Sequence, residues 1–187
     1  SAVAAISNVA ALTNDVSASA KITHSALNAT DALFGDMSQA LVARVMTGLQ
    51  YHTLIGENIT NATDLFKSDT VRIVDILGKA IVVSYVPALR VAGTPNKQKV
   101  LTLVAGGIMV SDSGDLITNI QTNNGQTRIE TTMQSDYTFG LGIKGFSWDE
   151  TNGGKSPTDA ELATGTNWDK VKTSVKECAG VITIGQE

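Results

Sequence analysis

Residues 71–110, VRIVDILGKAIVVSYVPALRVAGTPNKQKVLTLVAGGIMV, decide the fold, because they hold the densest β-branched apolar runs in the chain. Three short runs are separated by glycine and proline: Ile81–Val83, Val100–Val104 and Ile108–Val110. Such runs are typical of buried strands, since β-branched side chains pack well on a pleated surface. Pro87 and Pro95 lack an amide donor, which favours loops or a sheet edge. We predict a core sheet of two or three strands.

The composition is that of a globular protein with few charges. The chain has 187 residues, which suffice for one generous domain or two small ones. Hydrophobic residues make up 42%, enough for a core, whereas charged residues make up 17%, below the usual fraction of about a quarter. Small uncharged residues (Thr, Ser, Asn, Ala and Gly) take their place. A surface of this kind suits a protein that lies against neighbours.

Charge and cysteine content argue against several classes of protein. A net charge of -4 disfavours a nucleic-acid-binding domain, which normally has a basic face. Cys178 is the only cysteine, so neither an intrachain disulfide nor a cysteine zinc site is expected. No stretch approaches the roughly 20 apolar residues that span a bilayer. Residues 1–3 lack a basic region, so we expect no signal peptide, and the missing initiator Met suggests a processed, tagged or partial chain.

The N-terminal region, residues 1–36, is rich in Ala and Ser and is predicted to form two surface helices. The apolar residues at helical spacing are, in the first, Val3, Ile6, Val9, Ala10, Leu12 and Val16, and in the second, Ile22, Ala26, Ala29 and Leu33. Thr23 or Ser25 would cap the second helix and Gly35 would end it. Alternatively, the first is the tail of a longer helix.

A strand followed by a capped helix is expected next. Ala40–Met46 is short, apolar and β-capable, and Thr47 with Gln50 three residues later forms a possible capping box. The helix would run over Gly48–Ile55 and end at Gly56. This arrangement is the βα unit of many α/β proteins.

The C-terminal half is expected to be rich in strands. Asn123–Gly125 is a strong hairpin-turn signal, and a domain boundary is plausible near residues 116–125. The other expected elements are a turn at Ser111–Gly114, strands over Thr127–Met133 and Tyr137–Trp148, a loop over Asp149–Ser156, a helical turn opening at Pro157–Asp159 and a final strand over Val181–Ile184.

Few residues are candidates for acid–base chemistry or metal binding. His24 and His52 fall in different predicted helices and neither belongs to an HExxH arrangement, so structural or surface roles are favoured. Asp75 is flanked by apolar residues, and burial would raise the pKa of its carboxyl group as a catalytic acid requires. An exposed position on one face of the strand is the favoured interpretation.

The candidates for nucleophilic or phosphate chemistry are no stronger. Lys172 and Lys176 could lower the pKa of the Cys178 thiol, but no histidine lies near it in sequence. Gly106–Gly107 lacks the spacing and the Lys-Ser/Thr of a P-loop and is predicted to be a turn. No GxSxG elbow occurs. We therefore predict no catalytic, cofactor-binding or metal-binding residue, no cofactor and no enzymatic activity.

Several motifs occur in an order that matches a known family. The run ALVARVMTGLQYHTLI, residues 40–55, resembles the strand-then-helix segment of tailed-bacteriophage major capsid proteins, with Met46-Thr47-Gly48 where that family has Met-His-Ser. Further similar segments are Leu77–Ser84 followed by Pro87, Val104–Ile108, Gly145–Trp148 and residues 156–171 (SPTDAELATGTNWDKV). Two features of the family are missing here, the histidine of Met-His-Ser and the paired acids after the strand that corresponds to Ile81–Val83. These differences concern the subfamily more than the fold.

The resemblance covers roughly residues 26–184 and implies an α+β protein of the Hong Kong 97-type capsid fold. An axial domain with a central mixed sheet and flanking helices would be accompanied by peripheral-domain strands. The implied division is residues 1–20 as a remnant of the spine helix or peripheral domain, 21–120 as axial domain, and 121–187 as peripheral strands returning to the axial domain. The N-terminal arm and the extended loop of the family would be absent.

The implied function is that of a major capsid protein, which self-assembles into hexamers and pentamers of an icosahedral phage head around DNA. It would be made in the host cytoplasm and reside in the virion. Scaffold, portal or decoration proteins are possible partners, without specific nucleic-acid recognition or a membrane. Alternatives are an encapsulin-like nanocompartment shell protein, a small α+β hydrolase or ligand-binding domain, and a secreted adhesin or tail-fibre module.

Overall fold

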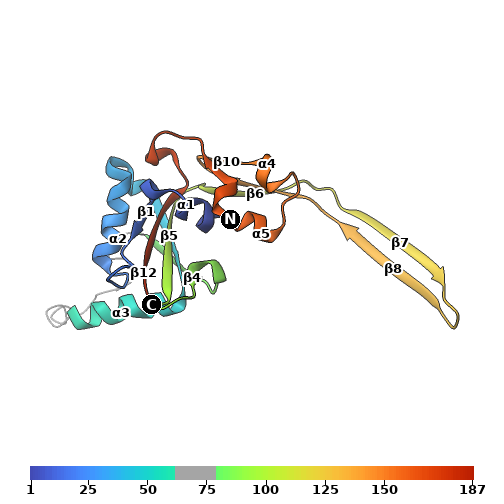
Figure 1. The fold of residues 1–187 in the computed structure, drawn as a ribbon, viewed down its shortest axis with the longest axis horizontal. Helices are drawn as coiled ribbons and strands as arrows, with labels where there is room; N and C mark the ends of the chain where they lie inside the picture. The colour runs from blue at the N-terminus through green and yellow to red at the C-terminus, as the bar shows by residue number, and fades with distance from the viewer. Residues whose placement is uncertain (62–78) are drawn as a thin grey trace. The chain divides into compact units, whose positions relative to one another are not determined.

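The computed structural model describes residues 1–61 and 79–187 (Figure 1). The chain divides into two compact units, which are described separately. Unit 1 comprises residues 1–107 and 143–187, and unit 2 comprises residues 108–142.

Unit 1 is built around a six-stranded mixed sheet. Its strands are β1 (Thr13–Asp15), β2 (Leu41–Met46), β3 (Ala80–Val83), β4 (Arg90–Val91), β5 (Lys97–Val104) and β12 (Gly180–Gln186). The order is β1-β12-β5-β2-β3, and β4 also pairs with β5. The pairs β1/β12 and β2/β3 are parallel, whereas β5 is antiparallel to β2, β4 and β12. The predicted α+β class with a mixed central sheet is confirmed.

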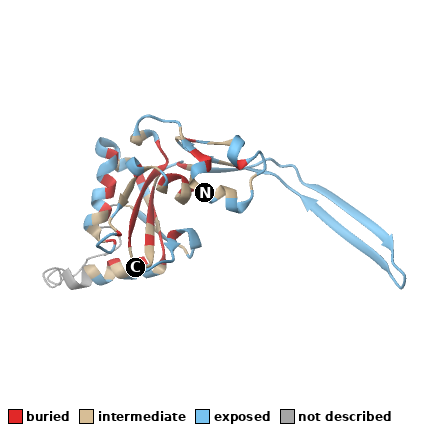
Figure 2. Ribbon diagram, in the orientation of Figure 1, coloured by how far each residue is buried: buried red, intermediate tan, exposed pale blue. Residues whose placement is uncertain are grey.

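The centre of the sheet is formed by its two longest strands, β5 and β12, which are also largely buried. Ile182 lies opposite Leu101, and Thr183 lies opposite Val100. Six of the seven residues of β12 are buried, and Figure 2 shows the buried residues concentrated in these strands. A strand that is buried on both faces reads as a continuous apolar run, which is why Val100–Val104 and Val181–Ile184 were recognisable in the sequence.

Two of the three apolar runs behave differently from the prediction of buried strands. Ile81–Val83 lies in β3, which is an edge strand of the sheet in the described part of the chain, and its Val82 and Val83 side chains are exposed. Ile108–Val110 lies in β6 (Ile108–Asp112), outside the central sheet. The apolar content of a strand does not by itself show whether the strand lies in the centre of a sheet, at its edge or outside it. Pro87 and Pro95 lie outside the strands, as predicted.

The first predicted helix is wrong beyond residue 7. The helix α1 spans only Ala2–Ser7, and the chain continues through a 3-10 turn, η1 (Ala10–Leu12), into β1. The backbone of β1 finds hydrogen-bond partners in β12. The Thr13 hydroxyl also donates to the Val9 carbonyl at 3.1 Å. Tertiary pairing therefore overrides the helical spacing of the apolar residues.

The second predicted helix is α2 (His24–Asp31). Thr23 is its N-cap, as predicted, because its Oγ1 accepts a hydrogen bond from the Ala26 amide at 3.2 Å. Gly35 does not end this helix. It lies inside the following 3-10 segment, η2 (Ala32–Ala40), where its φ of 52° makes a kink.

The predicted βα unit is present as β2, α3 (Gly48–Asn61) and the parallel strand β3. Thr47 Oγ1 accepts a hydrogen bond from the Gln50 amide at 3.3 Å, which is half of the predicted capping box. The Gln50 side chain instead donates to the Ile22 carbonyl at 3.0 Å. Gly56 does not end α3. One interior glycine costs only about 1 kcal/mol, which the rest of a helix can offset.

The rest of unit 1 consists of short elements, one before β4 and the others after residue 145. These are η5 (Pro87–Leu89), β10 (Phe146–Trp148), α4 (Glu150–Gly153), α5 (Asp159–Leu162), η6 (Gly165–Asn167), β11 (Trp168–Lys170) and η7 (Val175–Glu177). The predicted loop 149–156 is wrong in part, because Asp149 caps α4. The predicted helical turn after Pro157 is confirmed by α5, which Thr158 and Glu161 cap with a full capping box.

Unit 2 contains two antiparallel strand pairs, β6 with β9 (Phe139–Ile143) and β7 (Ile117–Asn124) with β8 (Ile129–Asp136). The predicted hairpin is confirmed, but its turn is displaced. Asn124 still pairs with Ile129, so residues 125–128 form the loop, closed by the Gly125 amide donating to the Arg128 carbonyl at 2.9 Å. The predicted single strand 137–148 is broken at Gly145, whose φ of 85° makes a turn between β9 and β10.

Candidate assembly surfaces

The β7–β8 hairpin exposes every residue of both strands (Figure 2). Strand alternation gives it two faces. The uncharged hairpin face carries Thr118, Ile120, Thr122, Asn124, Ile129, Thr131, Met133 and Ser135, and the polar hairpin face carries Ile117, Asn119, Gln121, Asn123, Glu130, Thr132, Gln134 and Asp136. Ile120 lies directly opposite Met133. The uncharged hairpin face is therefore an apolar stripe bordered by hydroxyl and amide groups.

Such a hairpin is not expected to be stable alone. A two-stranded ribbon in water is marginal, because neither face has a layer to pack against. In the part of the chain that the structure describes, β7 and β8 pair only with each other, so each has one unpaired edge. Unpaired edges and exposed apolar side chains together form a surface that gains free energy when another protein covers it.

The other end of unit 2 has a smaller apolar hollow of about 510 Å³, lined by Leu116, Tyr137 and Phe139 among others. The Tyr137 and Phe139 rings stack with centroids 6.4 Å apart. Asp115 at its rim accepts hydrogen bonds from Thr138, 2.9 Å from the hydroxyl and 3.2 Å from the amide. These bonds, the one from the Thr138 hydroxyl foremost, lower the pKa of the Asp115 carboxyl. Asp115 therefore keeps its charge and closes the loop before β7.

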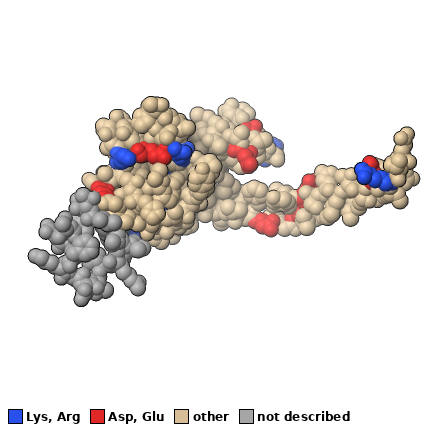
Figure 3. All heavy atoms as spheres, turned by 90° about the horizontal axis from the view of Figure 1, so that it is seen from below, with Lys and Arg blue, Asp and Glu red and all other residues tan. Residues whose placement is uncertain are grey.

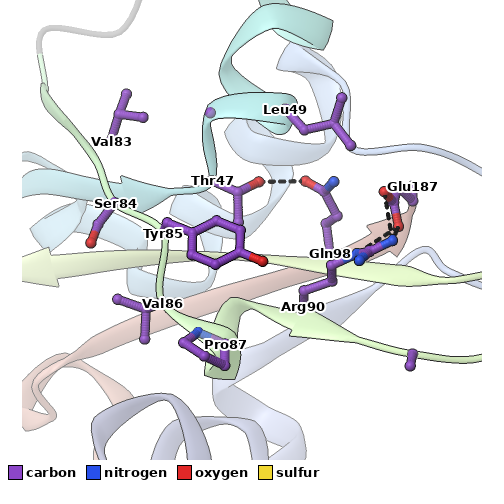
Figure 4. Close-up of a pocket in the computed structure, with 12 residues that line it drawn as sticks. Thr47, Leu49, Val83, Ser84, Tyr85, Val86, Pro87, Arg90, Gln98 and Glu187 are labelled. Atoms are coloured by element: carbon purple, nitrogen blue, oxygen red, sulfur yellow. Dashed lines mark hydrogen bonds and ion pairs between the residues drawn. The ribbon is translucent and has the colours of Figure 1, made fainter.

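Unit 1 carries a separate groove of about 610 Å³, the Tyr85 groove (Figure 4). Leu49, Val83, Tyr85 and Val86 form its apolar rim. Tyr85 is 91% exposed, although it is a large aromatic residue. The rim combines the start of α3 with the chain that leaves β3.

The polar groups at the floor of the Tyr85 groove are paired with one another. The Thr47 hydroxyl donates to Gln98 Oε1 at 2.8 Å. The Arg90 guanidinium makes two hydrogen bonds to the Glu187 carboxylate, at 2.9 and 3.0 Å. The two charged side chains of the groove are thus paired with each other.

Figure 3 shows one face of the molecule with few charged residues, most of that face being covered by uncharged residues.

A buried ion cluster fixes the start of β3. Asp31 at the end of α2 accepts from Arg44 of β2 at 2.5 Å and from Lys79 at 2.8 Å. Burial lowers the pKa of the Arg44 guanidinium, while the charge of Asp31 and its hydrogen bond act in the opposite direction. The cluster ties α2, β2 and the residue before β3 together, and so positions the edge strand beside the Tyr85 groove.

The residues that the sequence offered for chemistry lie apart. His24 begins α2, with Nε2 3.3 Å from the Leu54 carbonyl, whereas His52 is exposed and its ring meets that of Tyr51 edge-on. Cys178 is buried, and burial raises the pKa of its thiol. Asp75 lies outside the described residues. Gly106–Gly107 forms the predicted turn between β5 and β6, with a φ of 66° at Gly106.

The described residues contain no group of three or more His, Cys, Asp or Glu side chains arranged to hold a metal ion. In the same part of the chain, no helix is both long enough and apolar enough to cross a membrane.

The Tyr85 groove was not predicted from the sequence, because the exposure of a tyrosine near a proline depends on tertiary structure. The two faces of the hairpin, in contrast, are visible in the alternation of residues 117–136 once its register is known.

An exposed ribbon and a groove whose charged side chains are paired with each other are features of a protein that contacts other protein surfaces. The model of the Gp13-like family, major capsid protein 13-like, matches residues 1–182, and the chain belongs to this family. No curated protein matches the chain.

The family match settles the broad function. The protein is a structural major capsid protein of a bacteriophage head, resides in the virion and assembles into a multimeric shell. The predicted resemblance to phage major capsid proteins is confirmed. The match does not support the encapsulin-like, hydrolase and adhesin alternatives.

Proposed function

We propose that the chain has the Hong Kong 97-type capsid fold and forms the hexamers and pentamers of an icosahedral head shell. The family membership and the mixed α+β sheet of unit 1 support this assignment. In this proposal residues 21–120 are mainly axial domain, residues 1–20 are a remnant of the spine helix or peripheral domain, and residues 121–187 are peripheral strands that return to the axial domain. The role is structural, without a catalytic step.

The β7–β8 hairpin acts as the main contact arm between subunits. The observation that carries this step is the exposure of every residue in both strands, including the apolar pair Ile120 and Met133. A shell is the setting in which such a ribbon becomes covered, because each subunit is surrounded by copies of itself. The low charge of the chain removes much of the desolvation cost that buried charges would add.

The magnitude of the contribution follows from the exposed side chains. Ile120, Ile129 and Met133 are 63%, 68% and 66% exposed. Full burial of a side chain of this size contributes about 1.5–3 kcal/mol. Because only about two thirds of each side chain is exposed and can still be covered, the three together contribute on the order of 3–6 kcal/mol per subunit before the cost of association. A shell multiplies this contribution over many contacts.

The test is to make the uncharged hairpin face polar. The variant Ile120→Ser/Met133→Ser should raise the protein concentration needed for assembly by at least about tenfold, as measured by sedimentation and electron microscopy. The matched control is Asn119→Ser/Gln134→Ser, which changes the opposite pair on the polar hairpin face. Closed particles at an unchanged threshold in the first variant would contradict the arm role.

Further partners belong to the same proposal. Scaffold, portal or decoration proteins would contact the shell, and the chain would be made in the host cytoplasm before assembly. Electron microscopy of the wild-type chain under assembly conditions tests the shell itself. Monomers under every condition would argue against it.

A further inference from the structure

The Tyr85 groove has the properties of a contact surface rather than those of a small-ligand site. Its rim is formed by exposed apolar side chains, and its two charged residues, Arg90 and Glu187, already bind each other. A charged ligand would therefore find no unpaired charged side chain in the groove, and an uncharged polar ligand would meet a Thr47–Gln98 pair that is already joined. An apolar, uncharged protein surface can cover the groove without breaking either interaction (Figure 4).

The strand beside the groove lacks a common form of protection. Edge strands are often guarded by lysine side chains that prevent another strand from approaching. Lys79, immediately before β3, instead turns inward to Asp31 and is largely buried. The exposed residues Val82 and Val83 of β3 remain beside the groove. Among the described residues β3 has no strand on its outer side, so its exposed apolar side chains can be covered by a ribbon of a second copy.

We propose that the Tyr85 groove is the seat for the β7–β8 hairpin of a second copy of this chain, which inserts its uncharged hairpin face. The inference rests on the proposed contact-arm role of the hairpin. The choice of face follows from charge: the Arg90 and Glu187 side chains in the groove are paired with each other, and the uncharged hairpin face adds no charged side chain beside them. Glu130 and Asp136 on the opposite face would stay in water.

A contact between two different surfaces of the chain also suits a ring. The hairpin and the groove are different parts of the chain, so the contact between copies is heterologous, and heterologous contacts generate closed rings when the rotation closes. A groove of about 610 Å³ takes a few side chains. It is therefore one anchoring point within a larger interface, since a stable interface buries about 800 Å² per partner.

Cysteine cross-linking between two full-length variants tests the proposal. Tyr85→Cys is mixed with Ile120→Cys, assembled and oxidised, and covalent dimers are measured by non-reducing electrophoresis. The matched control replaces Ile120→Cys with Gln121→Cys, the next residue, which lies on the other hairpin face. Cys178 is buried and is present in every sample.

The proposal predicts at least about fivefold more mixed dimer with Ile120→Cys than with Gln121→Cys, because neighbouring strand residues point to opposite faces. If particles form but the yield of mixed dimer is the same for Ile120→Cys and Gln121→Cys, or Tyr85→Cys cross-links only with itself, the hairpin does not bind in the Tyr85 groove. The proposed shell function would be unaffected by that result. Absence of particles from the wild-type chain would overturn both.

A second variant gives an independent measurement. Tyr85→Asp puts a charge into the neutral groove and should raise the assembly threshold at least about tenfold, whereas Tyr85→Leu should keep it near that of the wild type. Since Tyr85 is almost fully exposed, neither change should alter the unfolding of the unassembled chain. Equal thresholds for the two variants would refute the seat.

Discussion

The buried Asp31 carboxylate offers a sharp test of how unit 1 is held together. We expect Asp31→Ala to destabilise the unassembled chain strongly. Asp31 and Arg44 are each only 4% exposed, and Lys79 shares the same carboxylate oxygen. Removing the carboxylate leaves two cations facing each other in a region with little water. Breaking a buried pair by removing one partner costs about 3–5 kcal/mol, a large fraction of the 5–15 kcal/mol that a domain commonly has.

The assay is urea unfolding followed by circular dichroism, with the free energy of unfolding taken from the midpoint and slope. The control is Asp36→Ala, which removes the same group from the Asp36–Lys176 pair. The Asp36 side chain is 94% exposed, and pairs in water contribute about 0–1 kcal/mol. If both variants lose the same free energy, or if Asp31→Ala loses less than about 1 kcal/mol, the ion cluster is not what fixes the start of β3.

Three further changes probe other parts of the fold. Phe34→Ala, at a fully buried position, should cost about 3–5 kcal/mol in urea unfolding. Gly180→Ala places a methyl group against the Thr102 carbonyl, so the β5–β12 pairing should weaken and amide exchange in both strands should accelerate. Thr138 lowers the pKa of Asp115, so this bond stabilises unit 2 above the ordinary carboxyl pKa and is lost as pH falls through the lower folded pKa. In Thr138→Ala the Asp115 midpoint, measured by NMR titration, should therefore rise.

Much of the sheet could be predicted from the sequence, because its central strands contain near-continuous apolar runs. Val100–Val104 and Val181–Ile184 are buried on both faces and were found by composition alone. Some local signals were also reliable: Thr23, one of the two residues predicted to cap α2, does so through a contact within three residues, whereas the helix ends predicted at Gly35 and Gly56 were wrong. Information of this kind is contained in neighbouring residues and does not depend on the rest of the fold.

Long-range pairing was not accessible in the same way. Residues 1–16 carry helical spacing, yet Thr13–Asp15 becomes a strand because β12, far along the chain, supplies its partner. The edge position of β3 likewise depends on which strands pair, and not on its apolar composition. The Tyr85 groove is the clearest case on the functional side, since its rim and floor come from α3, the β3 exit, β4, β5 and Glu187.

The placement of β12 between β1 and β5 has a consequence for synthesis. Thr13 pairs with Ile182, so the strand nearest the N-terminus waits for one that the ribosome makes last among those described. At about 5–20 residues per second, the wait lasts on the order of 10–30 s. After β5 has been made, and until β12 follows it, the nascent sheet exposes the β5 edge that β12 will occupy, and such an unpaired edge is a site for wrong pairing between nascent subunits. Release of a competent subunit is thereby tied to the emergence of residues 180–186.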